Sequence, residues 1–292
     1  MYKAIAANKR NTVVIMAVFV AIIGAIGWVF AYFFSDMSIL AYTMIFALVY
    51  ALIQYFVASS LAITMTGARE ADRSANERLY HVVDELSITI GLPMPKVYII
   101  EDKAPNAFAT GRDPKHAVVA VTTGLLEIMN DEELKAVMAH EMGHVQNYDI
   151  RVSMITFGLV CVIGLLSDIT GRILIGRSGG RGKDGGAVML VLGLVVWILA
   201  PIFAIIVQMA VSRQREYLAD SSSVMTTRYP EGMISALEKL KQYGMPMQRQ
   251  NSATEAMFIN NPLKKGFMSS LFSTHPPIEK RIDRLVDMKK KF

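Results

Sequence analysis

The chain has 292 residues, of which 53% are hydrophobic and 19% are charged. This composition departs from that of an average soluble globular protein toward more apolar and fewer charged residues, so it indicates a membrane protein. The formal net charge of +5 is too diffuse to argue for nucleic-acid binding, and the single cysteine, Cys161, excludes an intramolecular disulfide.

The N-terminal region contains two long uncharged stretches, residues 11–35 and residues 37–68. Each can supply the roughly 20 apolar residues that a membrane-spanning helix needs. The first stretch is too long for the apolar part of a secretory signal and lacks a small-residue cleavage site, so we expect it to be retained. Residues 1–68 are therefore predicted to form a transmembrane hairpin.

The charges that flank this hairpin predict its orientation. The turn between the two stretches carries only Asp36, whereas the outer flanks are basic, with Lys3, Lys9 and Arg10 before the first stretch and Arg69, Arg73 and Arg78 after the second. Positive residues favour the cytoplasmic side of a membrane. Both ends of the hairpin are therefore expected in the cytoplasm.

Residues 69–151 have the pattern of an α+β domain. The segment "READRSANERLYHVVDELSITIGL" predicts a helix that ends at Gly91, and "PKVYIIE" and "HAVVAVT" are β-branched-rich runs typical of strands. Between these runs, "NAFATGRDP" predicts an edge strand, or a strand and turn, on the rim of a small sheet. We expect Asn106, Ala107 and Phe108 of this segment to contact a bound substrate.

A well-marked helix is predicted to begin after Asn130. Asn130 is a suitable N-cap, and Glu133 three residues later completes the pattern of a capping box. Within this helix, "HEMGH" places His140 and His144 at positions i and i+4, about 5–6 Å apart at Cβ. Both imidazoles can therefore reach one cation.

These two histidines and Glu141 predict a catalytic metal site. Zinc binds neutral imidazole nitrogens, and catalytic sites combine three protein ligands with one open position for water. Glu141 is placed to accept a proton from that water as it attacks a carbonyl group. A structural zinc site would not need this carboxylate, so we expect one catalytic Zn²⁺ per chain.

A second hydrophobic hairpin is predicted over residues 152–212. Residues 152–167 and 186–212 are uncharged and are joined by a polar, glycine-rich segment. The first arm covers about 24 Å, short of a hydrocarbon core near 30 Å, so the hairpin either crosses the bilayer or is partly embedded. Beyond it, Glu216 and Asp220 share a helical face, so one can bind the metal while the other holds a ligating histidine's ring N–H.

Four motifs occur in a fixed order along the chain, "NAFATG", "HEMGH", "EYLAD" and "THPP". With the order of the hydrophobic segments, they make the chain resemble the HtpX-type membrane zinc metalloproteases, relatives of the eukaryotic CAAX prenyl endopeptidases. The likeness runs over nearly the whole chain. Together the four motifs are far more specific than the HExxH pattern alone.

The resemblance implies a mainly helical α+β membrane protein with a thermolysin-like zincin catalytic domain. It implies zinc bound by His140, His144 and Glu216, with Glu141 as the general base and Asp220 beside a ligating histidine. The implied substrates are peptides and misfolded or damaged membrane proteins. The implied role is membrane-protein quality control and stress response.

The resemblance also implies a multi-pass protein of the bacterial inner membrane, with the catalytic domain and both termini in the cytoplasm. The expected organisation has hairpins at residues 1–68 and 152–212. The catalytic domain is then assembled from residues 69–151, with the HExxH helix, and residues 213–292, with the third ligand.

The motif "STHPPIEKRIDRL" suggests a further catalytic residue. Its two prolines hold His275 on a rigid turn. Peptide hydrolysis builds negative charge on the former carbonyl oxygen, and zincin sites commonly add a side-chain donor to receive it. We expect His275 to be that donor and Arg281 to support the same region. The alternative is that the prolines start the final helix and His275 caps it.

The sequence also bears on other possible functions. A non-enzymatic membrane scaffold or transporter with a structural zinc site leaves Glu141 unexplained, and no charged residue inside the first two spans marks an ion pathway. A prenyl-protein processing enzyme uses the same chemistry and stays open. "GRGKDG" matches the GxGxxG string but follows no βαβ strand, so no nucleotide is expected. The expected surroundings are the lipid bilayer, with no nucleic-acid partner.

Overall fold

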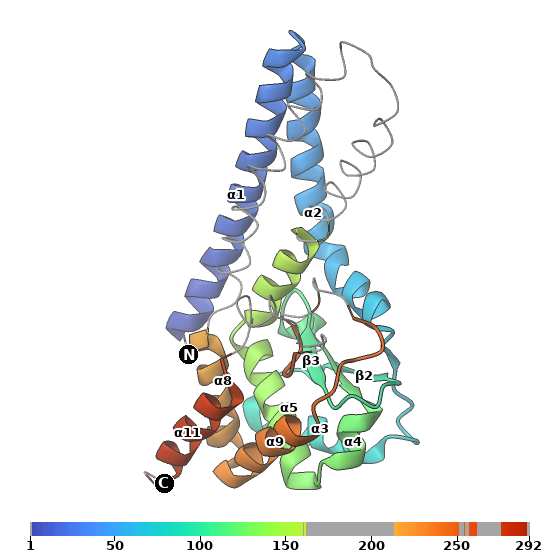
Figure 1. Ribbon diagram of the computed structural model, residues 1–292, viewed down its shortest axis with the longest axis vertical. Helices are drawn as coiled ribbons and strands as arrows, with labels where there is room; N and C mark the ends of the chain where they lie inside the picture. Colours follow the sequence, from blue (N-terminus) through green and yellow to red (C-terminus); the bar gives the residue numbers. More distant parts are fainter. Residues whose placement is uncertain are drawn as a thin grey trace. The chain divides into compact units, whose positions relative to one another are not determined.

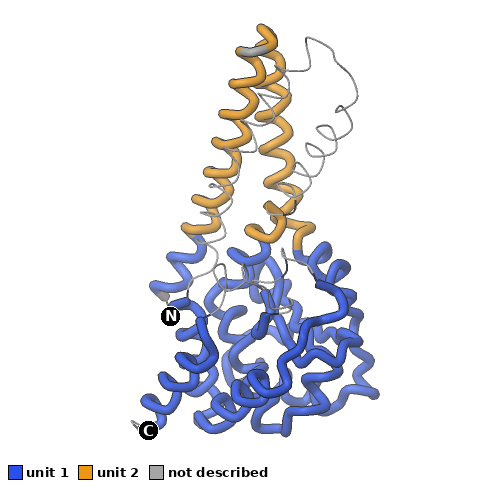
Figure 2. The backbone as a smooth tube through the Cα atoms, in the orientation of Figure 1, with its two compact units in different colours: residues 1–9, 59–154, 211–292 blue, residues 10–58, 155–210 orange. Residues whose placement is uncertain are grey.

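The computed structural model describes residues 2–159, 161, 213–250, 254, 257–261 and 276–290. The chain divides into two compact units (Figure 2), the first made of residues 1–9, 59–154 and 211–292, and the second of residues 10–58 and 155–210. The helices and strands of both units are labelled in Figure 1. The first helix begins in the first unit and continues into the second.

The second unit contains most of α1 (Tyr2–Phe33) and α2 (Ser38–Thr66). Both helices are long and apolar enough to cross a membrane, which confirms the two long apolar helices predicted for residues 1–68. Large apolar side chains are exposed on both, including Trp28, Tyr32, Tyr42 and Leu52. Such a surface suits contact with lipid rather than with water.

The first arm of the second predicted hairpin is helical over residues 149–159. Its end packs against α2, where the Tyr50 hydroxyl donates a hydrogen bond of 2.7 Å to the Gly158 carbonyl. A Cβ at Gly158 would overlap the Gln54 side chain, so glycine permits the close approach. Apart from Cys161, the rest of residues 160–212 lies outside the described residues, as does the glycine-rich connection.

The first unit contains a four-stranded sheet in the order β1-β2-β4-β3. The strands are β1 (Arg69–Glu70), β2 (Lys96–Ile100), β3 (Ala107–Thr110) and β4 (Val118–Thr122). Strands β2 and β4 are parallel, and the other pairs are antiparallel. The predicted strands are confirmed, with β3 at the edge of the sheet. That edge is joined by a bridge between Phe108 and Phe258.

Helices complete the first unit, and their described bounds are α3 (Glu77–Ile90), η1 (Pro114–His116), α4 (Thr123–Ile128), α5 (Asp131–Gln146), α8 (Arg213–Thr227), α9 (Pro230–Tyr243) and α11 (Ile278–Lys289). Helix α3 ends at Gly91 as predicted, because Gly91 adopts a positive φ of 75° and donates to the carbonyls of Ser87 and Ile88. Helix α5 packs against α3, α8, α9 and β3, so it lies at the centre of this unit.

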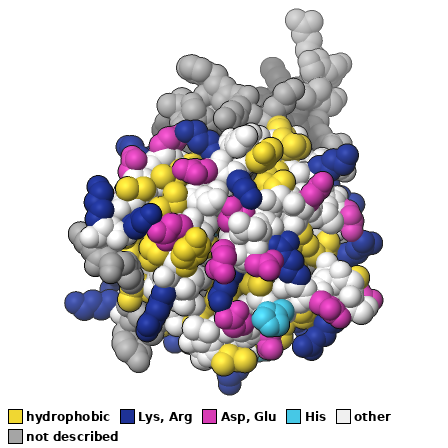
Figure 3. All heavy atoms as spheres, turned by 90° about the horizontal axis from the view of Figure 1, so that it is seen from below, with side chains coloured by type: hydrophobic (Ala, Val, Ile, Leu, Met, Phe, Trp, Pro, Cys, Tyr) yellow, Lys and Arg dark blue, Asp and Glu magenta, His cyan; other side chains and the backbone are white. Residues whose placement is uncertain are grey.

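The apolar core of the first unit lies around α5. It combines side chains from α3, the sheet, α5 and α9, among them Leu79, Leu86, Val119, Val121, Val137, Met138 and Leu237. On the face seen from below, acidic and basic side chains are interspersed among apolar ones (Figure 3). Exposed ion pairs such as Lys241–Glu279 belong to this unit. A charged outer surface over an apolar core is typical of a domain in water, in contrast to α1 and α2.

Candidate metal centre

The N-terminus of α5 is fixed by a capping box. The Asn130 side chain accepts a hydrogen bond from the Glu133 N–H at 2.9 Å, and the Glu133 carboxylate accepts one from the Asn130 N–H at 2.8 Å. This confirms the predicted cap. Glu133 also accepts hydrogen bonds from Ser235 at 2.6 Å and Lys239 at 2.7 Å, both on α9. Burial alone raises the pKa of Glu133, but these partners lower it below its ordinary value.

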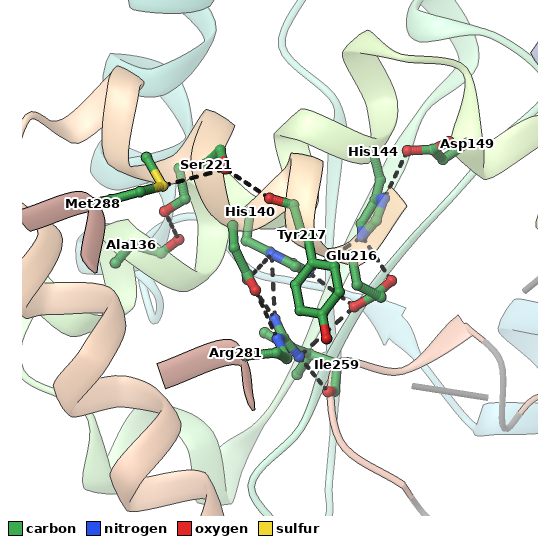
Figure 4. Close-up of polar contacts among 12 residues, drawn as sticks. Ala136, His140, His144, Asp149, Glu216, Tyr217, Ser221, Ile259, Arg281 and Met288 are labelled. Atoms are coloured by element: carbon green, nitrogen blue, oxygen red, sulfur yellow. Dashed lines mark hydrogen bonds and ion pairs between the residues drawn. The ribbon is translucent and has the colours of Figure 1, made fainter. Parts of the chain in front are cut away.

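His140 and His144 on α5 and Glu216 on α8 direct their polar atoms toward one another (Figure 4). The two Nε2 atoms are 3.2 Å apart, the His144 Nε2 is 3.4 Å from Glu216 Oε1, and the His140 Nε2 is 3.7 Å from Glu216 Oε2. Among the residues that the structure describes, these three are the group of possible metal ligands whose atoms all lie within 4.8 Å of one another.

The spacing of these three side chains fits a zinc-sized cation. A tetrahedral zinc ion, with nitrogen at about 2.0–2.1 Å and oxygen at about 2.0–2.2 Å, holds neighbouring ligand atoms about 3.3–3.5 Å apart. The His144 Nε2 lies 3.2 Å from the His140 Nε2 and 3.4 Å from Glu216 Oε1, close to those tetrahedral edges, and one ligand atom from each of the three residues lies within 4.8 Å of the other two. Two imidazoles and one carboxylate are also a donor set that zinc favours in catalytic sites. The residues present therefore fit the ion.

A close approach of α5 and α8 brings Glu216 to the two histidines. A Cβ at Gly143 would lie 3.3 Å from the Ser222 Cβ and 3.6 Å from the Ala219 Cα, so a larger residue would push α8 away. The Ser223 hydroxyl donates a hydrogen bond of 2.7 Å to the Ala136 carbonyl and ties the two helices together. The lack of a side chain at Gly143 thus serves helix packing.

The Nδ1 atom of His140 contacts a buried ion pair. It lies 3.0 Å from the Asp220 Oδ1, and Arg281 on α11 donates to both oxygens of Asp220, at 2.6 and 2.9 Å. Burial and the nearby Arg281 guanidinium keep the pKa of His140 below its ordinary value despite Asp220. The ring is therefore neutral, donates from Nδ1 and keeps the Nε2 lone pair toward the site.

The imidazole of His144 is held by a carboxylate that the sequence analysis did not single out. Its Nδ1 lies 2.9 Å from the Asp149 Oδ2. Burial alone lowers the pKa of His144, but Asp149 and Glu216 outweigh it and raise that pKa well above its ordinary value. Asp149 follows the turn that ends α5, so its place five residues after His144 was the only signal in the sequence.

Glu141 is next to His140 and is 2% exposed. It is not one of the three groups whose ligand atoms converge. Burial lowers the pKa of Arg281, but the carboxylates of Asp220, Glu216 and Glu141 outweigh it and raise that pKa. Glu141 is thus close enough to Arg281 to interact with it electrostatically.

The three residues expected to contact substrate lie at the start of β3 and are buried. The Asn106 side chain donates to the Asn260 carbonyl at 2.8 Å and accepts from the Asn260 N–H at 3.1 Å. The Ala107 carbonyl accepts from the Ile259 N–H at 2.9 Å. Phe108 meets Phe258 edge to face, with ring centroids 5.1 Å apart. These contacts attach residues 257–261 to the edge of the sheet.

Arg281 and His275 are the remaining site residues predicted from the sequence, and the structure describes only Arg281. Arg281 is 1% exposed and lies within the network around His140 and Asp220. His275 lies outside the described residues, so its role stays a prediction.

Comparison with known proteins agrees with this geometry. The model of peptidase family M48 matches residues 73–289. A protease HtpX homolog of Tropheryma whipplei is 53% identical over 292 residues, which cover 100% of both chains. A protease HtpX homolog of Streptococcus pneumoniae is 45% identical over 299 residues, which cover 99% of this chain and 100% of that relative.

A solved structure shares the fold. The crystal structure of S. mikatae Ste24p matches with a TM-score of 0.52 at 19% identity, covering 98% of this chain and 67% of that one. The motif-based resemblance is therefore confirmed at the level of the family, and the converging His-His-Glu group agrees with metal-dependent hydrolysis. The chain belongs to peptidase family M48 and is a membrane metalloprotease.

Proposed function

We propose that the chain is a zinc-dependent endopeptidase of the bacterial inner membrane that cleaves misfolded or damaged membrane proteins on the cytoplasmic side. The convergence of His140, His144 and Glu216, with Glu141 next to His140, carries the proposal. A site that only stabilised the fold would need the three ligands but not the neighbouring carboxylate.

The proposed mechanism gives each side chain one task. When bound, zinc supplies a Lewis acid that polarises the substrate carbonyl and makes a water molecule more acidic. Glu141 takes a proton from the attacking water and delivers it to the leaving amine. Asp220 and Asp149 hold the Nδ1–H groups of His140 and His144, so both Nε2 atoms stay directed toward the ligand position.

We also propose which residues contact the substrate. His275 is proposed to donate a hydrogen bond to the developing oxyanion, as its place in the "THPP" motif suggests. Contact of the substrate with Asn106, Ala107 and Phe108 is proposed from the "NAFATG" motif; their side chains are buried, and residues 257–261 pair with this edge of β3.

The membrane topology completes the proposal. We propose a thermolysin-like catalytic domain from residues 69–151 and 213–292, with both termini in the cytoplasm. The basic flanks of the first hairpin support this orientation. A Ser178→Cys variant in a Cys161→Ala background tests whether residues 152–212 cross the bilayer. Labelling from outside intact spheroplasts supports a full crossing, and protection from the label supports an embedded hairpin.

The chemistry is tested by separating metal binding from hydrolysis. We expect Glu141→Gln to retain one zinc per chain and to lose peptide hydrolysis by several orders of magnitude. His140→Ala, His144→Ala and Glu216→Ala should lose both zinc and activity. Glu132→Gln changes an exposed glutamate on the same helix and serves as the matched control. Full activity in Glu141→Gln would leave a structural metal site as the better account.

The substrate class is tested with the same inactive variant. Glu141→Gln is expected to bind substrates without releasing products, so proteins purified with it from membranes identify the substrates. Enrichment of membrane proteins in unfolded form, relative to the Glu216→Ala variant, supports the quality-control role. Recovery of the same proteins with both variants would contradict it.

A further inference from the structure

We infer that Asn8, near the start of α1, is a positioning residue for the metal centre. It orients the carboxylate of Asp149, which in turn orients the imidazole of His144. The inference rests on the proposed metal binding by His144. It goes further because it assigns part of the metal site to the helix that continues into the first apolar stretch.

The contacts form a short chain from Asn8 to the imidazole. The Asn8 Nδ2 donates a hydrogen bond of 2.6 Å to the Asp149 Oδ1 and another of 2.9 Å to the Asn147 carbonyl. The other oxygen of Asp149, Oδ2, lies 2.9 Å from the His144 Nδ1. Asn8 is 4% exposed and Asp149 is 3% exposed, so water does not replace these bonds easily.

The chemistry of the partners fixes the orientation of the Asn8 amide. A main-chain carbonyl and a carboxylate are both acceptors, so only the NH₂ group of asparagine can serve the two of them. The amide thus binds one carboxylate oxygen of Asp149 and leaves the second oxygen directed at His144. Without Asn8, the Asp149 Oδ1 still has the longer ion pair of 3.8 Å with Arg215, but rotation about the Cβ–Cγ bond and the direction of the His144 ring are less restricted.

The turn that carries Asp149 is also held by the start of α1. Tyr148 has a φ of 62°, a left-handed conformation that is uncommon for a residue with a large side chain. The Lys9 ammonium lies 4.6 Å from the centre of the Tyr148 ring, and the Arg151 guanidinium lies 4.8 Å from it. Residues 8 and 9 therefore contact every residue of the turn, Asn147, Tyr148 and Asp149.

A packing role alone does not account for Asn8. A buried position on a helix that leads into an apolar stretch is ordinarily filled by an apolar side chain, because an amide must find partners for its donors. The two donors of Asn8 both go to the turn after α5, and residues 1–9 group with the compact unit that contains the metal centre. The N-terminal segment is thus part of the site as well as the beginning of an apolar helix.

The test measures zinc affinity in the full-length protein in detergent, after removal of metal, by competition with a chromophoric chelator. Asn8→Leu keeps the size of the side chain and removes both donors. We expect it to raise the zinc Kd about tenfold, near the lower end of the effect of losing a partner of a metal-ligating histidine. Asn11→Leu changes the same residue type three positions further along α1 and serves as the control, with an unchanged Kd.

A double-variant cycle shows whether Asn8 acts through Asp149. Asp149→Ala should raise the zinc Kd about 10–100-fold. In that background we expect Asn8→Leu to have no further effect on the Kd, because the carboxylate that it positions is gone. The visible spectrum of the Co²⁺-loaded protein should change in Asn8→Leu and stay unchanged in Asn11→Leu. An equal loss of zinc affinity from Asn8→Leu with and without Asp149 would overturn the inference.

The outcome also separates this inference from the proposed function. If the wild-type protein binds one zinc and His144→Ala does not, the metal site stands. A wild-type Kd in Asn8→Leu then overturns only the role of Asn8. If His144→Ala binds zinc as the wild type does, the proposed metal site fails, and the role of Asn8 fails with it.

Discussion

The two halves of the metal centre are supported by different chemistry. The His140 side chain is 1% exposed, and its partner Asp220 is bound to the fully buried guanidinium of Arg281. The His144 side chain is 15% exposed, and its partner Asp149 accepts a hydrogen bond from the neutral amide of Asn8 and lies 3.8 Å from the Arg215 guanidinium. The first half therefore contains a close buried ion pair contributed by α8 and α11, and the second combines a longer ion pair with a hydrogen bond from α1.

This difference predicts that the two halves contribute differently to the stability of the fold and to metal affinity. A buried ion pair adds little net stability, but removing one partner leaves a charge without compensation in the interior. A neutral amide can be lost at smaller cost, although the carboxylate that it orients then has more freedom. We therefore expect breaking the Arg281–Asp220 pair to destabilise the fold strongly, and loss of the Asn8 amide to act mainly on metal affinity.

The largest expected effect comes from breaking the buried ion pair. Arg281→Met leaves the Asp220 carboxylate buried without its cation, so we expect the free energy of unfolding of the metal-free protein to fall by about 3–5 kcal/mol. Chemical denaturation in detergent measures it. Asp220→Asn combined with Arg281→Met leaves neither charge and should recover part of the loss. A loss below about 1 kcal/mol in the single variant would contradict a stability role for this pair.

An intermediate effect is expected in the half of the site that contains His144, where a proton on the imidazole competes with zinc binding. In the metal-free protein Asp149 and Glu216 raise the pKa of His144 despite burial, so the ring carries a proton at neutral pH. Zinc needs the neutral ring, so its binding releases this proton, and zinc affinity falls as the pH is lowered. Asp149→Asn removes one of these charges. It should raise the zinc Kd about tenfold and reduce the number of protons released.

Calorimetry of zinc binding in buffers with different ionisation enthalpies counts these protons. The raised pKa of His144 also affects the stability of the metal-free fold. Because the folded pKa of His144 lies above its unfolded value near 6.5, its proton stabilises the fold fully below about pH 6.5. This contribution is lost as the pH rises through the raised folded pKa. Equal proton release by Asp149→Asn and the wild type would show that Asp149 does not set the pKa of His144.

The smallest effect is expected from an exposed ion pair that involves the same helix as Arg281. Glu279 on α11 lies 2.9 Å from Lys241 on α9, and both side chains are more than half exposed. We expect Glu279→Ala to change the free energy of unfolding by less than about 0.5 kcal/mol, since water and salt screen such pairs. The comparison of Glu279→Ala with Arg281→Met shows whether burial, and not charge alone, determines how much an ion pair contributes to the free energy of unfolding. A loss as large as that of Arg281→Met would remove burial as the cause.

Local rules predicted much of the fold. The positive φ needed to end α3 was foreseen at Gly91, and the cap of α5 at Asn130 was foreseen from Glu133 three residues later. The helix predicted from Arg69 begins only at Glu77, strand β1 lies in the part before it, and helix α4 was missed. Strand β1 has two residues and exists because Arg69 and Glu70 pair with β2, and α4 has six residues, too few for a helical repeat to be recognised.

The sequence by itself determined that His140 and His144 share one face of a helix, because that relation depends only on the helical repeat. It left open whether Glu216 or Asp220 lies near the Nε2 atoms of the two histidines, which face the proposed metal position. The tertiary structure places one Glu216 oxygen near the His140 Nε2, the other near the His144 Nε2, and an Asp220 oxygen near the His140 Nδ1, as the close approach of α5 and α8 allows.

Only the tertiary structure brought Asn8 to Asp149, which is 141 residues away in the chain. No periodic pattern or turn rule connects positions so far apart. Their contact depends on a left-handed turn at Tyr148 and on the packing of the start of α1 against that turn. Local spacing thus specifies which side chains leave a helix together, whereas long-range packing specifies the partners that orient them.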